Sequence, residues 1–299
     1  MRRAEVRGRA MGSDLHIIVW AHSAAGRLAD LAVRRVDILE QCWSRFRADS
    51  ELNLLHLRAG QGSVPVSGDL HLLVSRMQEA HAWSDGDVDA TVHAGMVSMG
   101  YDTDFATVVS TPVPSTWLPK PGLGMAGVLL HDGVVSLPRG VALDPGALGK
   151  GLAGDIVTAE LASAGATAVL VSIGGDVVTH GTPPDAPGWR ISLRDDRTSQ
   201  RSELDVITLS ATQRAVATSS ILRRRWSGRH HVLDPQSGLP TESGVVQASV
   251  VADCGWRAEA GATLALVRGR DSIEWLRDRG CTAYLLQGAP APEGEPAHA

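Results

Sequence analysis

A glycine-rich segment at residues 143–155 has the residue types from which an anion-binding loop is built. It reads LDPGALGKGLAGD. Free backbone amides, a helix beginning after Gly151 and the charge of Lys150 could together hold a phosphate or carboxylate group. Asp144, just ahead of the glycines, could accept hydrogen bonds from the same ligand. Taken alone, the segment fits equally well a tight strand-to-helix connection with a solvated Lys150.

The same glycines also satisfy a dinucleotide-binding pattern. Gly149, Gly151 and Gly154 match GxGxxG, and Asp176 follows a predicted strand. Two details disfavour that interpretation, because Lys150 sits inside the glycine turn and four residues separate the turn from the preceding strand. A P-loop is excluded, since Gly151 stands where Ser or Thr is required and the glycine spacing is too short.

The composition limits the classes to which the chain can belong. With 299 residues, of which 43% are hydrophobic and 20% charged, it can bury a sufficient core without disulfides or a structural metal. A net charge of −5 and a pI near 6.1 argue against nucleic acid or a membrane surface as partner. Cys42, Cys254 and Cys281 are far apart and odd in number, so we expect neither a disulfide framework nor a CxxC metal site.

The N-terminal residues do not have the pattern of a targeting segment. Arginines at positions 2, 3, 7 and 9 precede an apolar run at residues 15–20, but this run is short and contains His16. It lacks a small-residue cleavage site and a lipobox cysteine, and no stretch approaches the ~18 apolar residues of a membrane span. We therefore expect no signal peptide, no membrane span and a cytoplasmic location.

Hydrophobic periodicity predicts the elements that must position the glycine-rich segment. Helical spacing of apolar residues predicts helices at residues 25–42, 51–57, 69–84, 152–164, 256–268 and 272–279. Apolar or alternating runs predict strands at residues 15–20, 168–173, 189–193, 204–209, 214–218, 230–233, 245–251 and 282–287, with a strand pair near 127–137.

The order of these elements predicts one α+β unit over residues 11–287. No repeat is visible and no linker divides the chain, so we expect two intimate lobes with mixed sheets and flanking helices. Residues 288–299 are rich in Pro, Ala and Glu, which predicts a disordered tail.

Seven segments, taken in order, resemble motifs of the ApbE family, the FAD:protein FMN transferases. Each is modest alone, but their shared order makes the resemblance specific. They are Met11-Gly12-Ser13; Ser44-Arg45-Phe46 with Asp49-Ser50-Glu51-Leu52; Asp87-Val88-Asp89-Ala90-Thr91; residues 143–155; Ser172-Ile173-Gly174-Gly175-Asp176; Ala217-Thr218-Ser219; and His230-His231-Val232-Leu233-Asp234-Pro235. The resemblance implies an ApbE-like, T-fold-related α+β fold.

The resemblance also implies which residues bind ligands. Positions that bind FAD in the family correspond here to Met11, Phe46, Val88, Asp89, Ala90, Asp144, Lys150 and Val232. The family's metal site uses a backbone carbonyl, here that of Ala147, with an Asp and a Thr four residues apart on a helix. Glu259 and Thr263 have that spacing, although Glu259 is one methylene longer than the usual Asp.

The chemistry implied is Mg²⁺-dependent transfer of FMN from FAD to a Ser or Thr hydroxyl of an acceptor flavoprotein, with release of AMP. Residues i and i+4 share a helix face, so Glu259 and Thr263 could hold one cation. Mg²⁺ prefers a few hard oxygen ligands and would neutralise the pyrophosphate of FAD. His231 could accept the hydroxyl proton, or it could be a structural turn residue beside Asp234.

Departures from the family pattern leave two alternatives open. Glu259 replaces the usual Asp, and Ala90 stands where Pro is usual. The chain could therefore be an FAD pyrophosphatase that uses water as acceptor, or a non-catalytic FAD-binding protein with an altered metal site. The basic cluster at residues 223–226 is interpreted as a solvated face rather than a phosphate contact.

Overall fold

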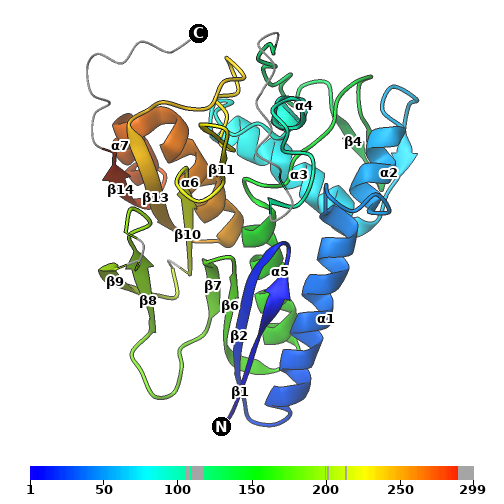
Figure 1. Ribbon diagram of the computed structural model, residues 1–299. Helices are drawn as coiled ribbons and strands as arrows, with labels where there is room; N and C mark the ends of the chain where they lie inside the picture. The colour runs from blue at the N-terminus through cyan, green and yellow to red at the C-terminus, as the bar shows by residue number, and fades with distance from the viewer. Residues whose placement is uncertain (106–107, 109–116, 199, 201, 213, 289–299) are drawn as a thin grey trace.

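The computed structural model describes residues 1–105, 108, 117–198, 200, 202–212 and 214–288 (Figure 1). Its helices, in chain order, are α1 (Ala25–Trp43), α2 (Glu51–Leu57), α3 (Gly68–Trp83), α4 (His93–Ser98), α5 (Gly149–Ser163), α6 (Gly255–Arg268) and α7 (Ser272–Arg277). None of these described helices is both long and apolar enough to span a membrane. The three cysteines are free thiols, as the sequence predicts.

A seven-stranded antiparallel sheet forms the main layer. Its strands, in spatial order, are β1 (Arg2–Ala10), β2 (Ser13–Ala21), β6 (Ala166–Ile173), β7 (Asp176–His180), β10 (Ala215–Ser220), β13 (Val245–Ala252) and β14 (Thr282–Gln287). Helices α1, α5 and α6 pack side by side against this sheet (Figure 1). The predicted α+β class is confirmed, but every recorded strand pairing is antiparallel, so the sheets are not mixed in direction.

Smaller sheets extend the fold on either side of this layer. Strands β3 (Val64–Pro65), β5 (Val134–Ser136) and β4 (Leu129–His131) form a three-stranded sheet, and β11 (Arg225–Trp226) pairs with β12 (Arg229–His230). Helices α2, α3 and α4 and strand β4 gather at one end of the molecule, at the top of Figure 1. The hairpin β8 (Trp189–Arg194)–β9 (Glu203–Leu209) packs on the face of the main sheet that the helices leave free.

Strand β6 is apolar at nearly every position because both of its faces are covered. Val169 and Val171 pack in the helix-side core, whereas Ala168 and Leu170 pack against the β8–β9 hairpin. A strand buried on both faces has no solvent side on which polar residues could alternate. The continuous apolar run in the sequence therefore predicts this strand correctly.

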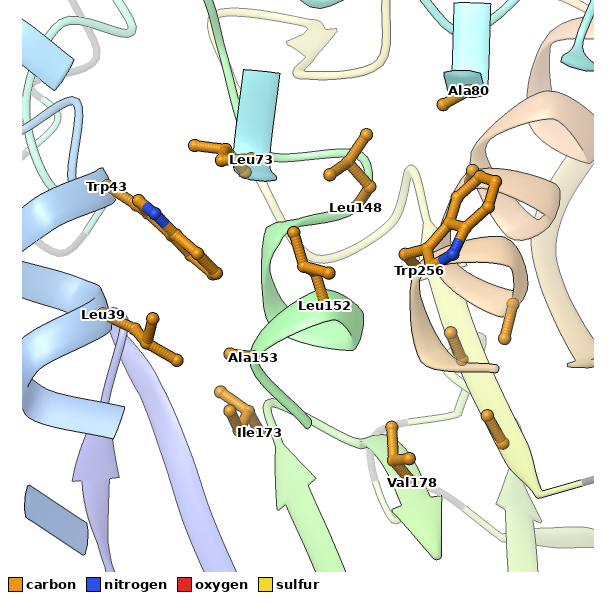
Figure 2. Packing of buried hydrophobic residues seen from close by; sticks show 14 of the residues in the cluster. Leu39, Trp43, Leu73, Ala80, Leu148, Leu152, Ala153, Ile173, Val178 and Trp256 are labelled. Atoms are coloured by element: carbon orange, nitrogen blue, oxygen red, sulfur yellow. The ribbon is translucent and has the colours of Figure 1, made fainter. Parts of the chain in front are cut away.

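Helix α5 lies between the sheet and the helices of the other end of the molecule. Figure 2 shows Ala153 of α5 next to Ile173 at the end of β6, and Leu152 on the side of α5 that faces Leu148 and the α3 residue Leu73. All five side chains are buried, with at most 3% of their surface exposed. The first turn of α5 is thus fixed by apolar contacts on two sides.

Helices α5 and α6 approach each other through paired glycines. A Cβ atom on Gly151 would lie 2.2 Å from the carbonyl oxygen of Gly255, and one on Gly255 would lie 2.3 Å from the carbonyl oxygen of Gly151. Asp155 of α5 also caps α6, because its carboxylate accepts the backbone N–H groups of Gly255 and Trp256 at 2.7 and 3.0 Å. The N-terminal turns of the two helices are therefore locked together.

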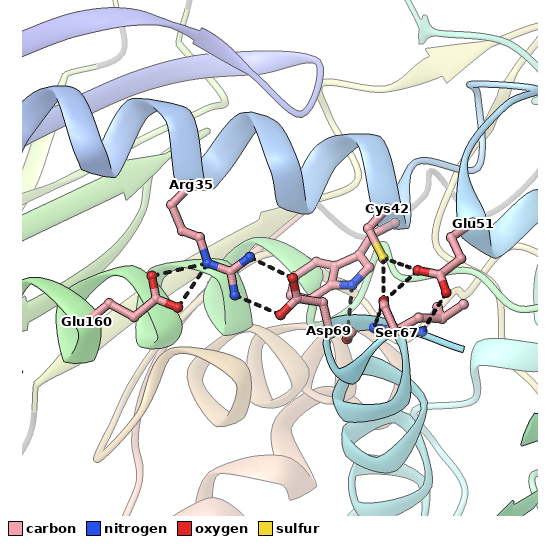
Figure 3. Close-up of polar contacts among 8 residues, drawn as sticks. Arg35, Cys42, Glu51, Ser67, Asp69 and Glu160 are labelled. Carbon is pink, nitrogen blue, oxygen red and sulfur yellow. Dashed lines mark hydrogen bonds and ion pairs between the residues drawn. The ribbon is translucent and has the colours of Figure 1, made fainter. Parts of the chain in front are cut away.

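A chain of polar contacts joins α1 to α3 and α5 (Figure 3). The Arg35 guanidinium donates to both carboxylate oxygens of Asp69 at 2.6 and 2.7 Å, and to Glu160 at 2.9 Å. Nearby, Glu51 of α2 accepts the backbone N–H of Ser67, the residue that caps α3. Bidentate pairs of this kind add geometric specificity, so the network fixes how the helices lie relative to one another.

Two predictions about secondary structure are wrong, and one edge strand was not predicted. Helix α5 begins at Gly149, not at residue 152, so the glycine-rich segment supplies its first turn. Residues 230–233 are not one strand, because β12 ends at His230 and Leu233 makes only an isolated bridge to Pro240. The arginine-rich residues 2–10 form the unpredicted edge strand β1. Of the predicted disordered tail at residues 288–299, all but Gly288 lies outside the described residues.

The glycine contact between α5 and α6 predicts a large loss of stability on filling it. We expect Gly151→Ala to lower the free energy of unfolding by about 3 kcal/mol, since the backbone of α6 must move to admit the methyl group. Gly26 lies at an exposed position of α1, with no atom within 4 Å of its Cβ position, so Gly26→Ala should raise the free energy of unfolding by about 0.5 kcal/mol. Urea denaturation measures both. Equal effects of the two substitutions would contradict this account of the packing.

Candidate active site

A cavity of ≈ 620 Å³ opens beside the first turn of α5 and collects most of the predicted site residues. Those that line it are Met11, Phe46, Val88, Asp89, Asp144, Ala147, Lys150, His231, Val232 and Thr263. They come from segments far apart in the sequence, including the β1–β2 turn, the loops after α1 and α3, the start of α5 and helix α6. The structure thus brings these residues together in one cavity, and their roles stay predictions.

Two predicted residues lie behind the cavity wall. Ala90 contributes through its carbonyl oxygen, which accepts the backbone N–H of Asp144 at 2.8 Å and so supports the glycine-rich segment. Glu259 is 1% exposed and reaches the cavity only through Lys150, to which it is paired. In this conformation neither the Ala90 nor the Glu259 side chain lines the cavity.

Lys150 pairs with two buried carboxylates. Its ammonium contacts Glu259 in a short ion pair and lies 2.9 Å from Oδ2 of Asp176. The other oxygen of Glu259 accepts the backbone N–H of Gly151 at 2.8 Å. The alternative of a solvated Lys150 is thus wrong for this conformation, because Lys150 is paired with Glu259 and Asp176. One amide proposed for an anion site, that of Gly151, donates to Glu259.

The electrostatics of this cluster follow from burial and pairing. Burial alone would lower the pKa of Lys150, but the carboxylates of Asp176 and Glu259 outweigh burial and raise it above its ordinary value. Burial raises the pKa of Glu259 although Lys150 opposes the rise. Lys150 therefore remains charged at neutral pH and provides a positive charge at the cavity.

Asp144 forms a second buried ion pair, with Arg45. Arg45 Nε lies 3.0 Å from Asp144 Oδ2, and the two side chains are only 4% and 9% exposed. Asp144 Oδ1 accepts the backbone N–H of Gly146 at 2.7 Å. Burial would raise the pKa of Asp144, but Arg45, His93 and the N–H of Gly146 together outweigh burial, so its pKa lies below the usual range. The sequence did not identify Arg45 as the partner of Asp144.

Three buried polar atoms of the cavity lining have no hydrogen-bond partner in the part of the chain described. They are Arg45 Nη2, Asp144 Oδ2, whose contact with Arg45 lacks hydrogen-bond geometry, and His231 Nδ1. Buried polar atoms in folded proteins nearly always have partners. Their gathering at one cavity indicates that a polar ligand supplies the missing bonds.

His231 is neutral in this environment. Burial lowers the pKa of His231 most, the charge of Arg224 lowers it further, and the resulting pKa is about 3. Its ring packs edge-on against Tyr101, with centroids 6.4 Å apart. A neutral imidazole can accept a proton, which is compatible with the predicted role as a base.

Aromatic rings form an apolar part of the cavity lining. Tyr101 lies 5.7 Å from Phe46 and 6.0 Å from Phe105 between ring centroids, and 5.4 Å from Trp226. The guanidinium of Arg45 lies between the rings of Phe46 and Tyr101, at 4.1 and 4.3 Å. Both phenylalanines of the chain and one of its two tyrosines are in this group, so the cavity has rings on which a planar ligand could stack.

Sequence reasoning missed several cavity residues. Arg45 stands inside the recognised Ser-Arg-Phe motif, so its place there was an available signal. Tyr101 and Phe105 lie in a stretch without hydrophobic periodicity, so the sequence offered no signal for them. The basic cluster at residues 223–226 was interpreted as solvated, but Arg224 lines the cavity and Arg223 pairs with Asp196 at 2.8 Å.

The oxygen groups assigned to Mg²⁺ would supply only part of its coordination shell, so they fit an ion that is also bound by a ligand in the cavity. Ala147 and Thr263 line the cavity, and the ammonium of Lys150 already places a positive charge against Glu259. Within the described residues, no group of three or more His, Cys, Asp or Glu side chains could hold a metal alone. Mg²⁺ commonly completes such a sparse protein site with water and phosphate oxygens.

Comparison with known proteins finds the family that the sequence motifs resemble. The ApbE family matches residues 11–285. The FAD:protein FMN transferase of Escherichia coli (strain K12) is 24% identical over 296 residues, which cover 93% of this chain and 82% of that protein. The FAD:protein FMN transferase of Rhodobacter capsulatus is 29% identical over 238 residues, covering 77% of this chain and 44% of that protein.

Solved structures share the fold. The crystal structure of the ApbE protein from Thermotoga maritima superposes with a TM-score of 0.84 at 24% identity, covering 96% of this chain and 94% of that one. The flavin transferase ApbE from Vibrio cholerae gives a TM-score of 0.79 at 20% identity, with coverage of 96% and 94%. Because the family match extends over nearly the whole sequence, the chain belongs to the ApbE family.

Proposed function

We propose that the protein cleaves FAD and transfers FMN to a Ser or Thr hydroxyl of an acceptor protein, releasing AMP. The observation that carries the proposal is the cavity in which aromatic rings adjoin unpartnered buried atoms of Arg45, Asp144 and His231. A ligand with a flat ring system and an anionic group matches both parts. The relatives named FAD:protein FMN transferase support the same reaction.

In this reaction the acceptor hydroxyl oxygen bonds to the FMN phosphorus while the bond from that phosphorus to the bridging oxygen of the pyrophosphate breaks. The bridging oxygen leaves with AMP, and the hydroxyl proton passes to a base. His231 is the candidate for that base, because it is neutral and lines the cavity. Its tautomer would be set by the ligand, since Nδ1 has no partner among the described residues.

The remaining cavity groups would bind and orient FAD. Phe46, 39% exposed, offers a face for the isoalloxazine ring, with the buried Tyr101 packed against Phe46, and Lys150 offers positive charge to the pyrophosphate. Mg²⁺ held by the Ala147 carbonyl, Thr263 and Glu259 would neutralise charge on the phosphates as AMP departs. Lys150 and Arg224 add positive charge from the chain itself.

The direct test uses the full-length protein with FAD, Mg²⁺ and protein extract from its own organism as the source of acceptor. We expect AMP release that requires the extract, with FMN found by mass spectrometry on a Ser or Thr of one or a few proteins. AMP release without extract would instead indicate a pyrophosphatase. FAD binding without any cleavage would indicate a binding protein. Either of these two results contradicts the proposal.

A contribution of Thr263 to Mg²⁺ binding predicts an effect that added metal overcomes. Thr263→Val keeps the side-chain shape but removes an oxygen ligand, so the Mg²⁺ concentration for half-maximal AMP release should rise about tenfold. Thr158→Val is the matched control, because the Thr158 hydroxyl donates only within α5, to the carbonyl oxygens of Gly154 and Asp155. An unchanged Mg²⁺ requirement in Thr263→Val would remove Thr263 from the site.

The pKa of His231 predicts how its contribution depends on pH. His231→Asn should lower kcat/KM for FAD about 10²-fold or more if His231 accepts the proton. Because its pKa of about 3 keeps His231 neutral at higher pH, the ratio of wild-type to variant rates should stay constant between about pH 5.5 and 8. A ratio that falls as pH is lowered through about 6.5, the ordinary histidine value, would contradict this assignment.

A further inference from the structure

The ammonium of Lys150 lies between the carboxylates of Glu259 and Asp176, each of which is held by a backbone N–H. Glu259 is anchored by the N–H of Gly151 at 2.8 Å, and Asp176 by the N–H of Thr218 at 3.0 Å. Both carboxylate side chains are almost fully buried, at 2% and 5% exposed, whereas that of Lys150 is 20% exposed and lines the cavity. The lysine is therefore the partner with freedom to move.

The charges of this cluster do not cancel, since one ammonium faces two carboxylates. Removing a cation from buried carboxylates is strongly unfavourable unless another cation replaces it. A cation that enters from the cavity therefore competes directly with the lysine for Glu259. The lysine can leave without being stranded, because the cavity offers it a place beside an anionic ligand.

The use of a lysine at position 150 favours an ammonium that can change partners. Only two of the chain's 28 Lys and Arg residues are lysines, Lys120 and Lys150. The other buried pair of this site uses the rigid, planar guanidinium of Arg45, whose Nε lies 3.0 Å from Asp144 Oδ2. An ammonium on a flexible four-carbon stem is a compact point charge without that rigid geometry, and can pass from a carboxylate to a phosphate oxygen.

We propose that Lys150 is a resident counter-cation that occupies Glu259 and keeps divalent cations weakly bound until an anionic ligand draws its ammonium into the cavity. The inference rests on the proposed function, because it takes Mg²⁺ and the FAD pyrophosphate as the two ligands. FAD and Mg²⁺ then favour each other's binding, and the metal site forms fully only when the nucleotide is present.

The test measures metal binding without FAD, so it does not depend on catalysis. Isothermal titration of Mg²⁺ at about pH 8, where the ordinary carboxylate is ionised, compares full-length wild type with Lys150→Met and Lys150→Arg. We expect Lys150→Met to bind Mg²⁺ at least about tenfold more tightly than wild type, and Lys150→Arg to stay as weak as wild type. Lys120→Met, the change at the chain's other lysine, should leave the affinity unchanged.

A second measurement covers variants that fold poorly. Without metal, Lys150→Met should unfold at a lower temperature than wild type, and Mg²⁺ should raise its Tm more than that of wild type. Lys150→Gln, which removes the charge but keeps a donor, should lie between them. Equal Mg²⁺ affinity in wild type and Lys150→Met, or no Mg²⁺ effect on the Tm of either neutral variant, would overturn the inference. Failure of AMP release and FMN transfer in wild type would overturn the proposed function instead.

Discussion

Gly151 donates its backbone N–H to Glu259 across a contact between α5 and α6 that has no room for a Cβ atom. That contact places the start of α5, and with it Lys150 and Asp144, against the helix that carries Thr263. Asp155 holds the same two helices together by capping α6. Because Lys150 of α5 and Thr263 of α6 both line the cavity, its geometry depends on the close approach of these two helices.

The cavity combines two environments that a single element could not supply. The charges of Asp144 and Lys150 come from the glycine-rich segment, whereas the rings of Phe46, Tyr101 and Phe105 come from loops that follow α1 and α4. Arg45 belongs to both, since it stacks between two rings and pairs with Asp144. This coupling means that a ligand ring stacked on Phe46 and an anion near α5 are positioned by one connected set of contacts.

Local sequence patterns predicted the elements well where one physical effect dominates. The buried strand β6 and the amphipathic helix α1 follow from hydrophobic periodicity, and Lys150 and His231 follow from recognised motifs. The start of α5 was missed because glycines disfavour helices on their own, and tertiary contacts such as that of Gly151 with Gly255 require them there. The Lys150–Glu259 pair could not be foreseen, since it joins residues 109 positions apart through tertiary packing.

The most direct measurement is a crystal structure of the full-length protein with FAD and Mg²⁺ bound. The account predicts the isoalloxazine ring against Phe46 and Tyr101, the pyrophosphate at the first turn of α5, and the Lys150 ammonium on a phosphate oxygen. Thr263 and Glu259 would then contact the metal. FAD bound outside this cavity, or a pyrophosphate remote from α5 with Lys150 still paired to Glu259, would contradict it.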